Sequence, residues 1–160
     1  MLQATLLLYF GMPGPLELAI LGLLFGFFAG VMLLAPFIIY LLTLQRALAQ
    51  CHQNRQAMTP GMVYLLFIPL FGAIWHFFVV DAVGTSLQAE SAARGRPLPQ
   101  KPGHAIGITT CVLMVCGIIP GLGILCVFAG LICWIIYWVQ IAQAARELAT
   151  LPPVAPPFMA

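Results

Sequence analysis

His76 and Asp81 are the two ionisable residues whose positions could support chemistry within an apolar part of the chain. His76 interrupts the apolar stretch 62–80, and Asp81 follows that stretch directly. Ionisable side chains in an apolar segment are costly and often functional, so the pair could form part of a proton or ion path. Their spacing of five residues separates them on a helix. The alternative is that Asp81 lies at a polar boundary, while His76 bonds a backbone carbonyl or a neighbouring chain.

The five cysteines could supply thiolates, but their spacing does not favour this. Four of them lie in apolar stretches, where cysteine usually behaves as a small hydrophobic residue. Cys126 and Cys133 could share a helix face and hold Cu(I) together with Met114 or His76, because Cu(I) favours soft ligands. No C-x-x-C, C-x-C or Met-x-x-Met spacing supports such a site. We therefore expect no metal site.

The remaining polar residues do not form a recognisable catalytic set. The four acids all look terminal or interfacial: Glu17, Asp81, Glu90 and Glu147. Haem would need a second axial ligand beside His76, and His52 and His104 fall in polar loops. The sequence thus predicts a protein without a cofactor that is not an enzyme.

The composition places these residues in a membrane protein. The chain is 62% hydrophobic and 6% charged, whereas ordinary globular domains carry about 25% charged residues. Residues 18–42 and 105–139 contain no charged or amide side chain, and a membrane span needs roughly 20 apolar residues. The net charge of +2 is too small to suggest nucleic acid as a partner. We expect an all-α integral membrane protein whose main partner is the lipid bilayer.

Prolines and glycines divide the chain into a helical membrane domain and two flanking segments. Residues 1–14 are apolar but broken by glycine and proline, so we expect them to lie at the membrane interface. Residues 15–149 form the membrane domain, which begins with a long span kinked at Pro36. Residues 150–160 contain four prolines and are predicted to be an extended tail.

An Ile-Pro-x-x-Gly motif occurs twice after the first span, at 68–72 and at 119–123. Two helix–Pro–helix units of this kind would form a parallel internal repeat, as in some transporters, although chance can also produce so short a match. Each unit is predicted either to cross the membrane as a kinked helix or to turn back as a hairpin. The helix breaks are expected at Pro36, Pro69, Pro120, Gly121 and Gly123.

The basic residues favour the hairpin alternative. If each unit crosses once, three basic residues fall on each side; if each turns back, all six fall on one side, as the preference of Lys and Arg for cytoplasmic loops requires. The segment 104–119 reaches about 22 Å and can turn back within the membrane, whereas 61–68 reaches only about 12 Å and would insert shallowly. The six residues are Arg46, Arg55, Arg94, Arg96, Lys101 and Arg146.

Gly22, Gly26 and Gly30 are spaced four apart and lie on one face of the first span. Glycines at this spacing let two helix backbones approach closely in lipid. The face could pack against another helix of the same chain or against another subunit.

A longer pattern resembles a group of small bacterial integral membrane proteins. Members of that group carry N-R-x-M-x-P-G, then I-P-x-F and W, followed by a Ser-Leu-x-x-Glu-like element, which here occupies 86–90. The resemblance extends to about residue 142, and Tyr64 stands where the group has Trp. The group has no assigned activity, so the resemblance implies no catalytic residue. The matching residues begin Asn54-Arg55-x-x-Met58-x-Pro60-Gly61-x-x-Tyr64-Leu65-x-x-Ile68-Pro69-x-Phe71-x-x-x-Trp75.

These observations predict a non-enzymatic, multi-pass protein of the bacterial cytoplasmic (inner) membrane. We expect it to act as an oligomerising or accessory subunit, either as a homo-oligomer or within a larger membrane complex. One alternative is a small homo-oligomeric ion or proton channel. Its lining would include His76 and two consecutive threonines, Thr109 and Thr110. Another is a membrane-shaping hairpin protein.

Overall fold

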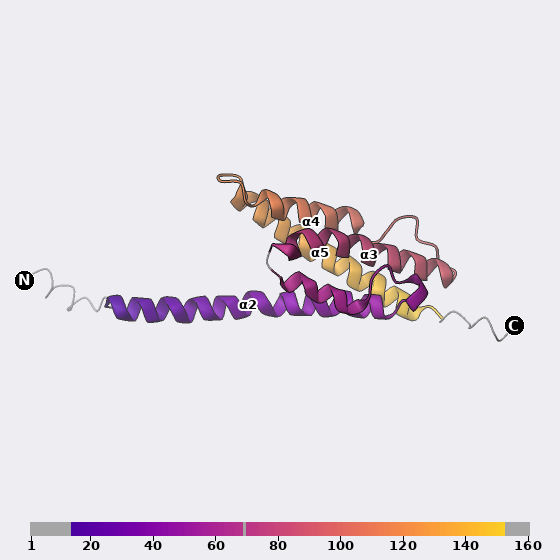
Figure 1. The fold of residues 1–160 in the computed structure, drawn as a ribbon, viewed down its shortest axis with the longest axis horizontal. Coiled ribbons are helices and arrows are strands. Elements are labelled where there is room, and N and C mark those ends of the chain that lie inside the picture. The colour runs from indigo at the N-terminus through magenta and orange to yellow at the C-terminus, as the bar shows by residue number, and fades with distance from the viewer. Residues whose placement is uncertain (1–13, 69, 153–160) are drawn as a thin grey trace, which may run out of the picture. The chain divides into compact units, whose positions relative to one another are not determined.

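The computed structural model describes residues 14–68 and 70–152, and every regular element in these ranges is a helix. The prediction of an all-α protein is confirmed for this part of the chain (Figure 1). The predicted interfacial segment, Pro69 and most of the predicted tail lie outside the described residues. The elements are α2 (Pro15–Ala49), η1 (Gln53–Arg55), η2 (Pro60–Phe67), α3 (Phe71–Ala93), α4 (His104–Cys116) and α5 (Gly123–Thr150).

The chain divides into two compact units, residues 1–39 and residues 40–160. From Gly14 onward the first unit consists of helix α2, which continues through Pro36 into the second unit. The helix therefore does not end at Pro36, and the kink predicted there stays a prediction. A proline inside a helix removes one backbone hydrogen bond, and neighbouring bonds keep the helix intact, as membrane helices often allow.

In the second unit, helices α4 and α5 run antiparallel and α3 packs against both (Figure 1). Gly107 of α4 permits this close packing. A Cβ added there would lie 2.5 Å from Cγ1 of Val80 on α3 and 3.0 Å from the ring of Tyr137 on α5. The last turns of α2 contribute Tyr40 and Leu44, which are fully buried. The core of this unit is therefore built from all four α-helices.

The two Ile-Pro-x-x-Gly motifs build the same chain reversal. In each motif the glycine N–H donates to the isoleucine carbonyl, over 2.7 Å from Gly72 to Ile68 and 2.8 Å from Gly123 to Ile119. The third position has a positive φ in both, 64° at Leu70 and 90° at Gly121. This backbone conformation is easy for glycine and costs about 1–2 kcal/mol for other residues. The sequence repeat therefore corresponds to a repeated local structure.

A close backbone contact explains why each motif ends in glycine. A Cβ added to Gly72 would lie 2.6 Å from the carbonyl oxygen of Leu66, and one added to Gly123 would overlap the carbonyl oxygen of Gly117. In both motifs the contacted carbonyl belongs to the residue six positions earlier. The chain can fold back this tightly only where the side chain is a hydrogen atom.

The two chain reversals connect different pairs of helices. The second joins α4 to α5, whereas the first joins η2, a 3-10 helix, to α3. Trp75 of α3 donates its indole N–H to the carbonyl of Met62 in η2, over 3.0 Å. Helices η2 and α3 therefore also lie side by side. The first helix–Pro–helix unit thus consists of two separate elements, η2 and α3. A 3-10 helix rises about 2.0 Å per residue, so η2 spans about 16 Å.

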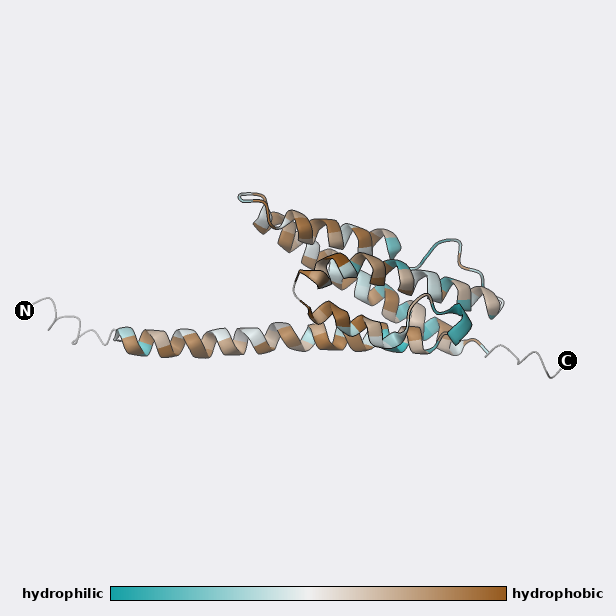
Figure 2. Cartoon of the chain, viewed as in Figure 1, coloured by the Kyte–Doolittle hydropathy of each residue, from teal (hydrophilic) through white to brown (hydrophobic). Residues whose placement is uncertain are grey.

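Helices α2 and α5 are long and apolar enough to cross a membrane, by length and composition. Polar residues of the second unit gather at one end, where α2, α3 and α5 finish and α4 begins (Figure 2). All six basic residues lie in the last two turns of these helices or in the loops that follow them. The opposite end carries the apolar chain reversals.

Replacing Gly123 by Ala should destabilise the protein by about 1–3 kcal/mol, the usual cost of overpacking. The added Cβ would meet a backbone carbonyl that cannot rotate away. Gly61→Ala is the matched control, because a Cβ at Gly61 meets nothing within 4 Å. Thermal unfolding in detergent measures both. Equal melting temperatures for the two variants would show that the tight reversal at Gly123 does not exist.

Candidate functional site

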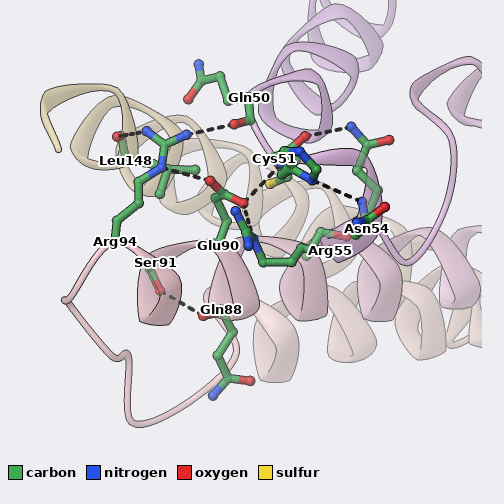
Figure 3. A network of polar contacts seen from close by, with 12 residues as sticks. Gln50, Cys51, Asn54, Arg55, Gln88, Glu90, Ser91, Arg94 and Leu148 are labelled. Atoms are coloured by element: carbon green, nitrogen blue, oxygen red, sulfur yellow. Dashed lines mark hydrogen bonds and ion pairs between the residues drawn. The ribbon is translucent and has the colours of Figure 1, made fainter. Parts of the chain in front are cut away.

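Glu90 of α3 is the centre of a buried polar network (Figure 3). Its side chain is only 3% exposed. One carboxylate oxygen accepts from Nε of Arg55 over 2.7 Å and from the backbone N–H of His52 over 3.0 Å. The other oxygen accepts from Nε of Arg94 over 2.9 Å. Both oxygens are therefore held by charged or fixed donors.

Arg94 connects this carboxylate to the ends of two other helices. One terminal nitrogen donates to the carbonyl of Leu148 near the end of α5, over 2.9 Å. The second donates to the carbonyl of Gln50 just beyond α2, also over 2.9 Å (Figure 3). Carbonyls at a helix C-terminus lack helical partners and carry the negative end of the helix dipole, so a guanidinium is well suited to bind them. Arg94 thus links the C-terminal ends of three helices.

The loop after α2 is fixed to the same network. Gln56 donates to the carbonyls of Leu48 and Cys51, over 3.0 Å and 2.8 Å. The backbone N–H of Ala57 donates to the hydroxyl of Ser86 on α3 over 2.9 Å. The Leu48 carbonyl also accepts from the Cys51 backbone N–H over 3.0 Å, so Gln56 adds a side-chain donor at the end of α2 and one just beyond it.

The electrostatics of this network favour a structural role. Burial by itself would raise the pKa of Glu90, but hydrogen bonds from Arg55, from the His52 backbone and from Arg94 outweigh it and lower that pKa to about 2. Glu90 is therefore ionised at neutral pH and is a poor proton acceptor. Burial raises the pKa of the nearby Cys51 thiol to about 11, so this thiol remains protonated and weakly nucleophilic.

Asp81 belongs to a second, more exposed group of charges. One of its carboxylate oxygens lies 2.5 Å from Nζ of Lys101 and 3.2 Å from Nε2 of His104. The hydrogen bond from Lys101 lowers the pKa of Asp81. Asp81 also lines a groove of about 790 Å³ between α3 and residues 53–62.

His76 lies in an aromatic cluster and is bonded to a side chain. Its Nε2 is 2.8 Å from the hydroxyl of Tyr40, and the Tyr40 ring also packs against Trp134 and Trp138. Tyr137 is fully buried beside them. Its hydroxyl has no hydrogen-bond partner among the described residues.

The structure does not join His76 and Asp81 into one site. His76 pairs with Tyr40, and Asp81 pairs with Lys101 and His104. Asp81 is half exposed, and the partner of His76 is a tyrosine hydroxyl rather than the backbone carbonyl considered from the sequence. Within residues 14–68 and 70–152, no group of three or more His, Cys, Asp and Glu residues could hold a metal ion.

The predicted packing face of α2 is open in the first unit. Gly22, Gly26 and Gly30 are exposed. A Cβ added to any of them would meet no described atom within 4 Å outside the backbone of its own helix.

Sequence reasoning missed the Glu90 network, because it placed Glu90 at an interface. The available signals were the spacing of Glu90 and Arg94, which are four apart and can pair on a helix, and the presence of both Arg55 and Glu90 in the longer pattern. Neither signal showed that residues 35 apart in sequence would meet.

Comparisons with known proteins add no such signal, because no family model, curated protein or solved structure matches the chain.

Replacing Glu90 by Gln should lower the free energy of unfolding by about 3 kcal/mol, because it leaves two guanidinium groups without their carboxylate in a buried setting. Glu147→Gln is the matched control. Its pair with Arg96 is more than half exposed on both sides, so its loss should cost less than about 1 kcal/mol. Denaturation in detergent measures the difference between the two variants, and equal losses would contradict the assigned role of Glu90.

The pH dependence provides an independent check of the same prediction. The pKa of Glu90 is about 2 in the folded state against an ordinary value of 4.5. The ion pairs should therefore stabilise the protein fully above about pH 4.5 and progressively less as the pH falls toward 2. The melting temperature of Glu90→Gln should depend less on pH over this range than that of the unmodified protein.

Proposed function

We propose that this chain is a non-enzymatic integral membrane protein that acts as an oligomerising or accessory subunit in the bacterial cytoplasmic membrane. The observation that carries the proposal is the exposure of α2. Its most apolar 18-residue stretch has no buried residue, and leucine and phenylalanine side chains such as Leu23 and Phe25 are more than 70% exposed. A long helix that is apolar on all sides requires lipid or other helices around it.

The distribution of charge supports an orientation in the membrane. The basic residues of the second unit lie at one end, and Lys and Arg are enriched on the cytoplasmic side. At the other end, the α4–α5 reversal exposes Ile118, Ile119 and Leu122. Helix α4 is about 20 Å long, shorter than a hydrocarbon core of about 30 Å. We therefore place the polar end in the cytoplasm and the apolar reversal within the bilayer.

The open glycine face supports a role in association. In lipid, helices associate through close packing and hydrogen bonds, because lipid tails are as apolar as leucine. Gly22, Gly26 and Gly30 leave such a surface uncovered in the first unit. The partner is proposed to be a second copy of this chain or another membrane subunit.

A membrane-shaping role is the second candidate, and the apolar α4–α5 reversal favours it. A hairpin that enters from one side and returns occupies the two leaflets unequally. This candidate predicts that purified protein converts liposomes into tubules, whereas a subunit role predicts copurifying partners and unchanged vesicles.

The channel alternative has less support. The hydroxyls of Thr109 and Thr110 bond the carbonyls of Ala105 and Ile106 in their own helix. His76 is bonded to Tyr40.

Replacing Gly26 by Leu should shift the protein to smaller oligomers in detergent, because the new side chain would hold facing backbones apart by several Å. Ala35→Leu is the matched control, since Ala35 lies on the opposite side of the same helix and receives the same side chain. Light scattering coupled to size-exclusion chromatography gives the mass of both variants. An unchanged mass for Gly26→Leu would remove this face from the proposed interface.

The proposed orientation predicts labelling from a single side. In a cysteine-free background, Gln53→Cys, Gln100→Cys and Ala149→Cys should all react with an impermeant maleimide from the cytoplasmic face only. These positions lie beside the polar ends of α2, α4 and α5. Labelling of Gln100→Cys and Ala149→Cys from opposite faces would show that the α4–α5 segment crosses the membrane and would contradict the hairpin.

A further inference from the structure

The groove beside Asp81 combines two kinds of lining. One part is polar and comes from the loop after α2 and from α3, with Gln53, Thr59 and Asp81. The other part is apolar and includes Met62, Trp75 and Phe78. The two parts face one space of about 790 Å³, which is within the usual range for a small-molecule site. Such a lining suits an amphiphilic ligand.

The apolar part is held in a fixed geometry. The indole N–H of Trp75 donates to the Met62 carbonyl over 3.0 Å, which ties η2 to α3 across the groove. The rings of Trp75 and Phe78 lie with centroids 5.7 Å apart, and Phe78 remains 60% exposed. Trp at this level, between an apolar and a polar region, is typical of a membrane interface. An acyl chain could lie along these side chains.

The polar part presents the Asp81 carboxylate, and the Lys101 ammonium lies beside the groove within hydrogen-bond distance of it. Asp81 is the charged residue that lines the groove, and its pKa is lowered by Lys101, so its carboxylate is ionised at neutral pH. Lys101 and His104 both approach the same oxygen of Asp81. A lysine ammonium has three donors, so Lys101 can bind Asp81 and a second acceptor together. The group therefore matches a ligand that carries an ammonium and a phosphate close together.

We propose that this groove binds a zwitterionic phospholipid with a primary ammonium headgroup. The ammonium would bind the Asp81 carboxylate beside the faces of Trp75 and Phe78, which also attract cations. The phosphate would bind Lys101, and an acyl chain would pass over Met62. This inference depends on the membrane location proposed above, but it does not depend on the oligomeric state.

The test uses the intact protein reconstituted in nanodiscs that contain equal amounts of dioleoyl-phosphatidylethanolamine and dioleoyl-phosphatidylglycerol. The acyl chains are identical, so any preference reports the headgroup. Native mass spectrometry then counts the lipids of each kind that remain bound after release. We expect retained phosphatidylethanolamine to exceed phosphatidylglycerol about fivefold, the ratio that one partly exposed ion pair can supply. Equal retention, or a preference for phosphatidylglycerol, overturns the proposal.

Two variants assign the preference to this groove. Asp81→Asn should abolish it, because a neutral amide cannot attract the ammonium, whereas Glu147→Gln removes an exposed acid elsewhere at the polar end and should leave it unchanged. An Asp81→Asn protein that melts like the unmodified protein and still prefers phosphatidylethanolamine contradicts the site. Failure of the proposed function is a separate result, since a protein that purifies without detergent is not a membrane subunit.

Discussion

The ion pairs of one buried carboxylate determine how the helices of the second unit meet. The Glu90 carboxylate accepts hydrogen bonds from two guanidinium groups and from a backbone N–H. Arg94 also donates to carbonyls at the C-terminal ends of α2 and α5. A buried carboxylate with a single missing partner would be strongly destabilising. The helix ends therefore meet in an arrangement that bonds both oxygens of Glu90 and all three guanidinium nitrogens of Arg94. This constraint gives the polar end a defined structure although few polar residues are available to build it.

The apolar end is determined by backbone geometry instead. Two Ile-Pro-x-x-Gly motifs make reversals with the same glycine-to-isoleucine hydrogen bond and the same positive φ at the third position. Leu70 occupies this position in the first motif, where glycine would be less strained. A side chain on the final glycine would strike a backbone carbonyl, so glycine is required there. The motifs contain no polar residue, and the chain therefore reverses without one. Apolar loops of this kind can remain in a hydrocarbon environment, provided that protein covers their backbone.

Glu90 and His76, two ionisable side chains inside the second unit, are bonded to neighbouring side chains. The most buried charge, Glu90, is neutralised by arginines, and the buried His76 is paired with Tyr40. Asp81 and Glu147 are accessible acids that each line a groove. Buried polar groups of the described residues thus hold helices together, whereas these two accessible acids lie beside grooves at the polar end.

Composition and local pattern by themselves determined the helical class, the long apolar segments and the places where the chain can turn, because these depend on neighbouring residues. They placed Glu90 at an interface, although its side chain is buried. Only the tertiary structure decided that Arg55, Glu90 and Arg94 form one network, that His76 and Asp81 belong to separate groups, and that Tyr137 is buried. These outcomes depend on which helices pack together, and a local pattern carries no information about contacts between residues far apart in the chain.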